Sequence, residues 1–120
     1  MEAQRIALVT GSSSGIGFET SILLARSGYH TYASMRNLEK SKNITEIANR
    51  EKLPLQVVQL DVDDNKSVKD TIYRIESEEG RIVVVVNNAG YLLIGPLEEL
   101  SIEEFKEQFG TNFFGAIRVI

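Results

Sequence analysis

Four short apolar runs recur along the chain, and each is followed by a polar segment long enough for a helix. The runs cover residues 5–9, 30–35, 55–60 and 82–86. Parallel strands that are buried on both faces have successive apolar residues rather than strict alternation, and these runs show that character. The pattern therefore predicts four strands separated by helices.

The segments between the runs carry helical spacing and helix-end signals. They are residues 16–28, 38–52 and 63–80. Gly28 and Gly80 provide left-handed caps at two C-terminal ends, and Asp63 to Asn65 offer N-caps for the third helix. A capping box of Ser101 and Glu104 predicts a helix over residues 101–109. We expect a further helix over residues 112–120.

Strands that alternate with helices predict right-handed crossovers, a parallel sheet and helices on both faces. The fold class is therefore α/β, a Rossmann-type doubly wound sheet, with residues 1–120 as a single domain. In such sheets a ligand binds beyond the carboxyl ends of the strands. The loop that follows the first strand leaves the sheet at that edge.

Composition narrows the possible partners. With 13 Lys and Arg against 17 Asp and Glu, the net charge of −4 offers no broad basic field for nucleic acid. The longest aliphatic run, residues 82–86, is too short to cross a membrane, and no basic and apolar leader opens the sequence. The chain has no cysteine. We expect a cytoplasmic protein, since structural disulfides are rare there.

The stretch Val9–Gly17, VTGSSSGIG, joins the first strand to the first helix. Glycines at positions 11, 15 and 17 allow a sharp turn and a close backbone approach, and a helix N-terminus attracts anions. A pyrophosphate fits this description. The P-loop lysine is missing after the last glycine, which argues against an ATPase. A plain structural turn is the alternative.

Four motifs in register resemble the short-chain dehydrogenase/reductase family. They are TGSSSGIG (10–17), LDV (60–62), NNAG (87–90) and TNFFG (111–115). The resemblance covers the whole chain but corresponds to the N-terminal, cofactor-binding half of that family's domain. It implies a strand order of 3-2-1-4 and leaves the apolar fourth strand at an open edge. Such an edge favours pairing with a second copy, as does an exposed C-terminal helix.

The resemblance also implies roles for individual residues. The phosphates and ribose of a dinucleotide would be contacted by Gly11, Ser12, Ser13, Ser14, Gly15, Ile16 and Gly17. Asp61 and Val62 would contact the adenine edge, and Asn88, Ala89 and Gly90 would line the adenosine ribose and the sheet floor. Asn112 corresponds to the family's active-site asparagine, which holds a water in a proton relay.

Cofactor preference is predicted from the end of the second strand. An acidic residue at that position binds the ribose 2′-hydroxyl of NAD, whereas an arginine accommodates the 2′-phosphate of NADP. Arg36 stands there, and no acid occurs before Glu39. The sequence therefore favours NADP, with NAD as the alternative.

Other polar residues are assigned structural roles. Asp61, Asp63 and Asn65 alternate as calcium ligands do, but Lys66 replaces the glycine that the calcium loop requires, which argues against a metal site. His30, the only histidine, has no partner at a catalytic spacing. We expect it to be structural.

The family's proton donor is a tyrosine followed four residues later by lysine, and this pair is missing. The residues four positions after Tyr29, Tyr32, Tyr73 and Tyr91 are Ala33, Arg36, Ser77 and Gly95. The expected function is therefore the NADP(H)-binding half of a short-chain oxidoreductase acting on a carbonyl or alcohol. The alternative is a nucleotide-binding or assembly module without turnover.

Overall fold

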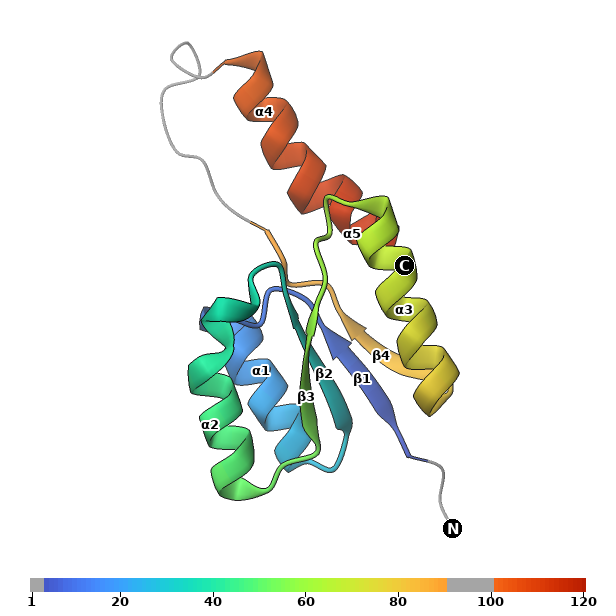
Figure 1. Ribbon diagram of the computed structural model, residues 1–120. Coiled ribbons are helices and arrows are strands. Elements are labelled where there is room, and N and C mark those ends of the chain that lie inside the picture. Colours follow the sequence, from blue (N-terminus) through green and yellow to red (C-terminus); the bar gives the residue numbers. More distant parts are fainter. Residues whose placement is uncertain (1–3, 91–100) are drawn as a thin grey trace.

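A four-stranded parallel sheet forms the centre of the computed structural model, which describes residues 4–90 and 101–120 (Figure 1). The strands are β1 (Ile6–Val9), β2 (His30–Met35), β3 (Leu55–Gln59) and β4 (Ile82–Val86). Their order is β3-β2-β1-β4, and all neighbouring strands are parallel. This confirms the predicted α/β fold and its strand order.

Helices cover both faces of the sheet (Figure 1). They are α1 (Gly15–Arg26), α2 (Lys42–Glu51), α3 (Asn65–Glu79), α4 (Ile102–Phe109) and α5 (Gly115–Val119), with a short 3₁₀ turn, η1 (Leu38–Ser41), before α2. On one face, α1 and α2 pack against β2 through Ile22, Met35 and Ile44. On the other face, α3 and α5 contribute Ile75 and Val119 to a second core.

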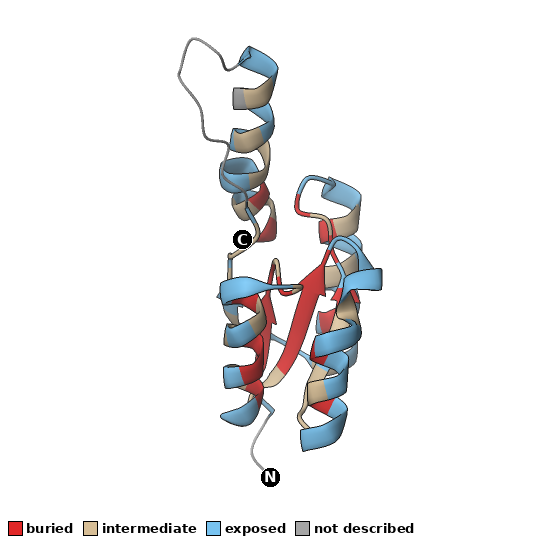
Figure 2. Cartoon of the chain, turned by 90° about the vertical axis from the view of Figure 1, so that its left-hand side faces the viewer, coloured by how far each residue is buried: buried red, intermediate tan, exposed pale blue. Residues whose placement is uncertain are grey.

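The two cores account for the burial of the strands between the helical layers (Figure 2). All four residues of β1 are completely buried, since β1 has a strand on each side and helices on both faces. The edge strand β4 is different, because Val83 is 54% and Val85 41% exposed. The described part of the chain therefore leaves an apolar edge open.

The helix ends follow the predicted signals. Asp64 is the N-cap of α3, and its carboxylate accepts hydrogen bonds from the backbone N–H groups of Lys66 and Ser67. Ser101 caps α4 by accepting from the N–H of Glu104. Gly28 and Gly80 have φ values of 95° and 94°, which residues with a Cβ rarely adopt.

The expectation of a further helix over residues 112–120 is confirmed in part, since a helix forms there but does not begin at Asn112. A π-helical turn, η3 (Gly110–Phe114), connects α4 directly to α5, so Asn112 lies inside a continuous helical segment (Figure 1). Gly110, the C-cap of α4, adopts ordinary helical angles, φ −56° and ψ −49°, so the chain continues into the π-turn without a break. The wider turn shifts the residues around Asn112 relative to a regular helix.

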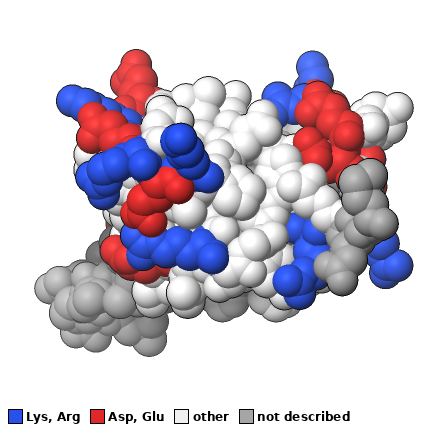
Figure 3. Space-filling model, turned by 90° about the horizontal axis from the view of Figure 1, so that it is seen from below, with Lys and Arg blue, Asp and Glu red and all other residues white. Residues whose placement is uncertain are grey.

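Charges on the described surface are mixed in sign. Viewed from below, at the end of the sheet away from α4, Lys and Arg side chains are interspersed with Asp and Glu (Figure 3). None of the helices within residues 4–90 and 101–120 has the length and apolar character of a membrane-crossing segment.

Candidate functional site

The glycine loop after β1 lies in close contact with the segment that follows β4. A Cβ on Gly11 would lie 2.9 Å from the Cα of Ala89, and a Cβ on Gly17 would collide with the Gly11 carbonyl and the Asn88 amide. Gly11 also has a φ of 65°. Two of the three glycines are therefore required by close packing.

Thr10 fixes this contact. Its side chain is buried, and its Oγ1 accepts hydrogen bonds from the N–H groups of Asn88 at 3.0 Å and Ala89 at 2.9 Å. The Asn88 side chain donates to the Gly11 carbonyl at 3.1 Å. The loop and the segment after β4 therefore form one hydrogen-bonded floor at the carboxyl edge of the sheet.

The N-terminus of α1 is open toward this edge. Gly15 has a φ of 63°, and a Cβ built on it meets nothing within 4 Å. The N-cap Ser14 is extended and makes no side-chain capping hydrogen bond, and no acid lies in the first turn. Free N–H groups and an uncompensated positive dipole end are what a phosphate requires.

A cavity of about 360 Å³ opens beside the glycine loop. Its walls come from four places: the loop, the end of β2 with η1, the segment after β3, and the residues after β4 together with η3. The residues are Gly11, Ser13, Met35, Arg36, Asn37, Lys40, Leu60, Asp61, Val62, Asp63, Ala89, Gly90 and Thr111. Segments far apart in sequence thus meet at the predicted edge.

The residues predicted to bind the cofactor divide into three groups. Gly11, Ser13, Arg36, Asp61, Val62, Ala89 and Gly90 line the cavity. Ser14, Gly15, Ile16, Gly17 and Asn88 form the adjoining loop, helix start and floor without lining it. Ser12 forms the third group, because it is fully buried.

The expectation that Ser12 contacts a ligand does not agree with its environment. Its hydroxyl donates to the Val9 carbonyl at 2.8 Å and accepts from the Ser21 hydroxyl at 3.1 Å. Its backbone N–H donates to the carbonyl of Ser34 at 3.0 Å. In this structure Ser12 supports the loop from inside.

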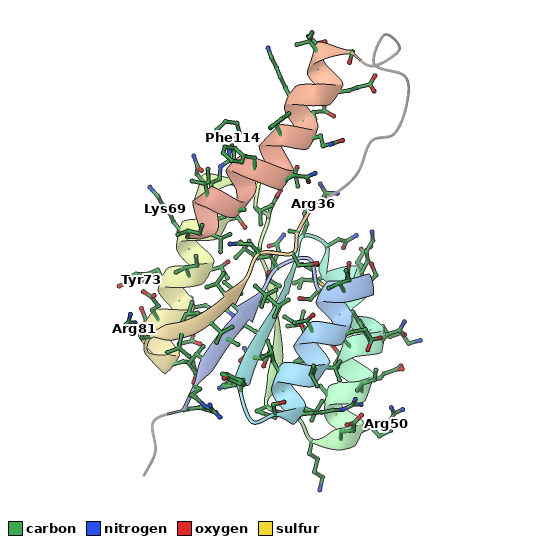
Figure 4. The ribbon with its side chains drawn as sticks, turned by 180° about the vertical axis from the view of Figure 1, so that it is seen from behind. Arg36, Arg50, Lys69, Tyr73, Arg81 and Phe114 are labelled. Carbon is green, nitrogen blue, oxygen red and sulfur yellow. The ribbon has the colours of Figure 1, made fainter. Side chains whose placement is uncertain are left out.

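Two cations share one side of the cavity. Arg36 lies where β2 ends (Figure 4), and Lys40, on η1, lines the same wall. Between them, Asn37 caps η1 by accepting from the N–H of Glu39 at 3.0 Å. Lys40 was not expected from the sequence, because Arg36 and the extended Asn37 precede η1 and no helical spacing connects Arg36 with Lys40.

Asp63 and Thr111 also line the cavity and were not expected from the sequence. The Thr111 hydroxyl donates to the Asp63 carboxylate, whose oxygens lie at 2.7 and 2.9 Å. A hydroxyl beside a carboxylate 48 residues earlier gives no signal in the sequence. Only the packing of η3 over the segment after β3 reveals it.

Asn112 lies next to the cavity rather than in its wall. A Cβ on Gly90, which does line the cavity, would be 2.7 Å from Asn112 Oδ1. On its other side, Asn112 borders a smaller hollow of about 110 Å³ together with Gln108, Phe109 and Phe113. Gly90 therefore leaves the space that the Asn112 side chain occupies.

His30 belongs to a buried cluster outside this cavity. Its ring stacks on Tyr32 with centroids 5.1 Å apart, and its Nδ1 lies 3.3 Å from Glu79. Burial raises the pKa of Tyr32 to about 12, and the Glu79 carboxylate adds to the shift. A tyrosine so reluctant to ionise is a poor proton donor, and the cluster packs α3 against β2.

The sequence pattern described as short chain dehydrogenase matches residues 5–120. The chain belongs to the short-chain dehydrogenase family. Retinol dehydrogenase 8 of Bos taurus is 44% identical across 99% of this chain, which spans 39% of that relative's length. Human 17-beta-hydroxysteroid dehydrogenase type 1 is 36% identical across 98% of the chain, with 37% of its own length covered.

Solved structures of short-chain dehydrogenases agree with this fold. A gluconate 5-dehydrogenase from Burkholderia cenocepacia in complex with NADP and tartrate has a TM-score of 0.87 and 29% identity over 98% of this chain. An actinorhodin polyketide ketoreductase with NADPH has a TM-score of 0.90 and 28% identity over 97%. The chain covers 46% and 44% of these two structures.

Replacing Thr10 with valine tests the floor of this short-chain dehydrogenase site. Thr10→Val keeps the shape of the side chain but leaves the Asn88 and Ala89 N–H groups without their acceptor. We expect the free energy of unfolding to fall by about 1–3 kcal/mol. Thr10→Ser, which keeps the hydroxyl, should lose less. Urea denaturation of the three proteins makes the comparison, and equal stability of Thr10→Val and wild type would contradict it.

Proposed function

We propose that this chain is the cofactor-binding half of a short-chain oxidoreductase that transfers a hydride between NADP(H) and a carbonyl or alcohol substrate. One observation carries the proposal. The cavity at the carboxyl edge of the sheet is lined by Gly11 and Ser13 of the loop that leads into the open N-terminus of α1, and by two cations, Arg36 and Lys40. Residues 1–120 act as a single dinucleotide-binding unit in this proposal.

The residues present fit a dinucleotide. Gly15 leaves open space at the helix N-terminus, where a phosphate could approach the backbone N–H groups. We assign Gly11, Ser13, Ser14, Gly15, Ile16 and Gly17 to the phosphates and ribose. We assign Asp61 and Val62 to the adenine edge and Asn88, Ala89 and Gly90 to the floor. The bound cofactor would supply the hydride, and this chain would bind and orient it.

NADP is preferred to NAD because two cationic side chains line the cavity beyond β2. They are Arg36, at the end of β2, and Lys40, in η1. A 2′-phosphate gains charge-assisted hydrogen bonds from such groups, whereas a 2′-hydroxyl prefers an acid. The two similar structures solved with NADP and with NADPH support the same choice. The absence of cysteine supports a reducing, cytoplasmic setting.

A non-catalytic nucleotide-binding or assembly module is the second candidate. It is favoured by one observation: no tyrosine in the sequence is followed four residues later by lysine. Asn112 alone would represent the catalytic machinery. We expect this chain to bind NADPH and to consume none above background with ketones or aldehydes, and steady turnover by the pure chain would contradict that.

Gly15→Ala tests the binding site, and Gly28→Ala is its matched control. Both glycines have a positive φ and open space around a built Cβ, at 63° and 95° respectively, but only Gly15 lies at the proposed phosphate site. Each substitution should cost about 1 kcal/mol of stability. NADPH affinity, measured by fluorescence titration, should fall roughly tenfold in Gly15→Ala alone. Equal affinity in both variants would make the loop a structural turn.

Arg36→Ala tests the choice of cofactor. A charge-assisted hydrogen bond to the 2′-phosphate is worth roughly 1.5–3 kcal/mol, so NADPH should bind about 10- to 150-fold more weakly. NADH affinity should hardly change, and added salt should reduce the wild-type preference for NADPH. Equal losses for both cofactors, or no loss for either, would show that Arg36 has another role.

We also propose that the isolated chain forms a homo-oligomer through the β4 edge or the α4–α5 helix. Val83 and Val85 on β4 and Ile117 on α5 are exposed apolar side chains. Val83→Lys should weaken an edge-to-edge dimer, whereas Ile117→Lys should weaken a helix-mediated one. Tyr73→Lys, on the exposed surface of α3 (Figure 4), is the control. Light scattering that finds a wild-type monomer at high concentration would contradict oligomerisation.

A further inference from the structure

The π-turn that carries Asn112 is fastened on its C-terminal side by Arg118. The Arg118 Nε donates to Asn65 Oδ1 at 2.8 Å, and its Nη1 donates to the Val62 carbonyl at 3.1 Å. The same Nη1 lies 3.5 Å from the carbonyl of Gly110, the first residue of the π-turn. One guanidinium therefore joins α5 and the π-turn to the segment between β3 and α3.

A second attachment holds the middle of the π-turn. Thr111, the residue before Asn112, donates its hydroxyl to the Asp63 carboxylate. Asp63 is itself fixed, since its N–H donates to Asp61 Oδ1 at 2.9 Å. Asp61, Asp63 and Thr111 all line the cavity. The wall assigned to adenine is thus hydrogen-bonded to the residue that precedes Asn112.

Two glycines let the helical segment pack closely against its neighbours. A Cβ on Gly115 would lie 2.8 Å from Val62 Cγ2, so α5 rests directly on the segment after β3. Asn112, three residues before Gly115, has its Oδ1 against Gly90. The position of Asn112 over the cavity floor therefore depends on how α5 and the π-turn are held.

We propose that Asp63 and Arg118 are positioning residues for Asn112, and that the Thr111–Asp63 hydrogen bond couples occupation of the adenine end to the asparagine. The coupling rests on the proposed function, because it needs a bound dinucleotide. The positioning role of Asp63 and Arg118 does not. π-helical turns are rare and occur mostly as single turns inside helices, often at functional sites. The contacts that hold this one join it to the capped segment before and at the start of α3: Thr111 donates to Asp63, and Arg118 of α5 donates to Asn65.

The geometric part is tested in the full chain without ligand. Arg118→Ala should increase amide hydrogen exchange of residues 110–114 by about tenfold or more relative to that of α1, and Arg118→Lys should recover part of the protection. Arg50→Ala, on α2 at the other end of the molecule (Figure 4), removes an equal charge and should change nothing. Unchanged exchange in Arg118→Ala would overturn the proposed role of Arg118.

The coupling is tested with adenosine 2′,5′-bisphosphate, which has the adenine end of NADP without the nicotinamide. In wild type, its binding should shift the NMR signals of the Asn112 side-chain amide. Thr111→Val, which cannot donate to Asp63, should lose most of that shift when compared with wild type at saturating probe. An equal shift in both proteins would overturn the coupling. No binding to wild type would overturn the proposed function and the coupling, and the exchange experiment would still decide the role of Arg118.

Discussion

The close contact between the loop after β1 and the segment after β4 is the constraint on which the site depends. Thr10 Oγ1 accepts hydrogen bonds from the backbone N–H groups of Asn88 and Ala89. The lack of a Cβ on Gly11 and Gly17 lets the backbones of the two segments approach each other. Because β1 and β4 are neighbouring parallel strands, both segments leave the sheet at the same edge. That contact forms the floor from which the N-terminus of α1 rises.

The three glycines of the loop after β1 show what the sequence could predict about the site and what it could not. Their spacing indicated a turn that approaches a ligand, but it treated positions 11, 15 and 17 alike. The structure separates them, because Gly11 and Gly17 serve internal packing while Gly15 faces open space. A similar division applies to the serines, since Ser12 is buried and Ser13 lines the cavity. Local sequence encodes the turn, whereas burial depends on what the rest of the chain brings next to it.

The order of strands and helices followed from hydrophobic pattern and capping residues, which act over a few neighbouring positions. The π-turn did not. Its contacts are long-range: Thr111 donates to Asp63, 48 residues earlier, and Arg118 on α5 donates to the carbonyls of Val62 and Gly110. For the same reason the sequence did not indicate that Lys40, Asp63 and Thr111 line the cavity. Long-range contacts of this kind have no periodic signature.

The distribution of contacts around the cavity also bears on which parts of the site can respond to a ligand. The floor is held by the buried side chain of Thr10 at the end of β1, and buried contacts are costly to open locally. The wall formed by η3 is held by a few exposed side-chain hydrogen bonds, because the Thr111–Asp63 and Arg118–Asn65 contacts both lie at the surface. Exposed contacts cost less to break than buried ones. A bound dinucleotide would therefore meet a rigid floor and a more adaptable wall, and the adaptable wall is the part of the structure that carries Asn112.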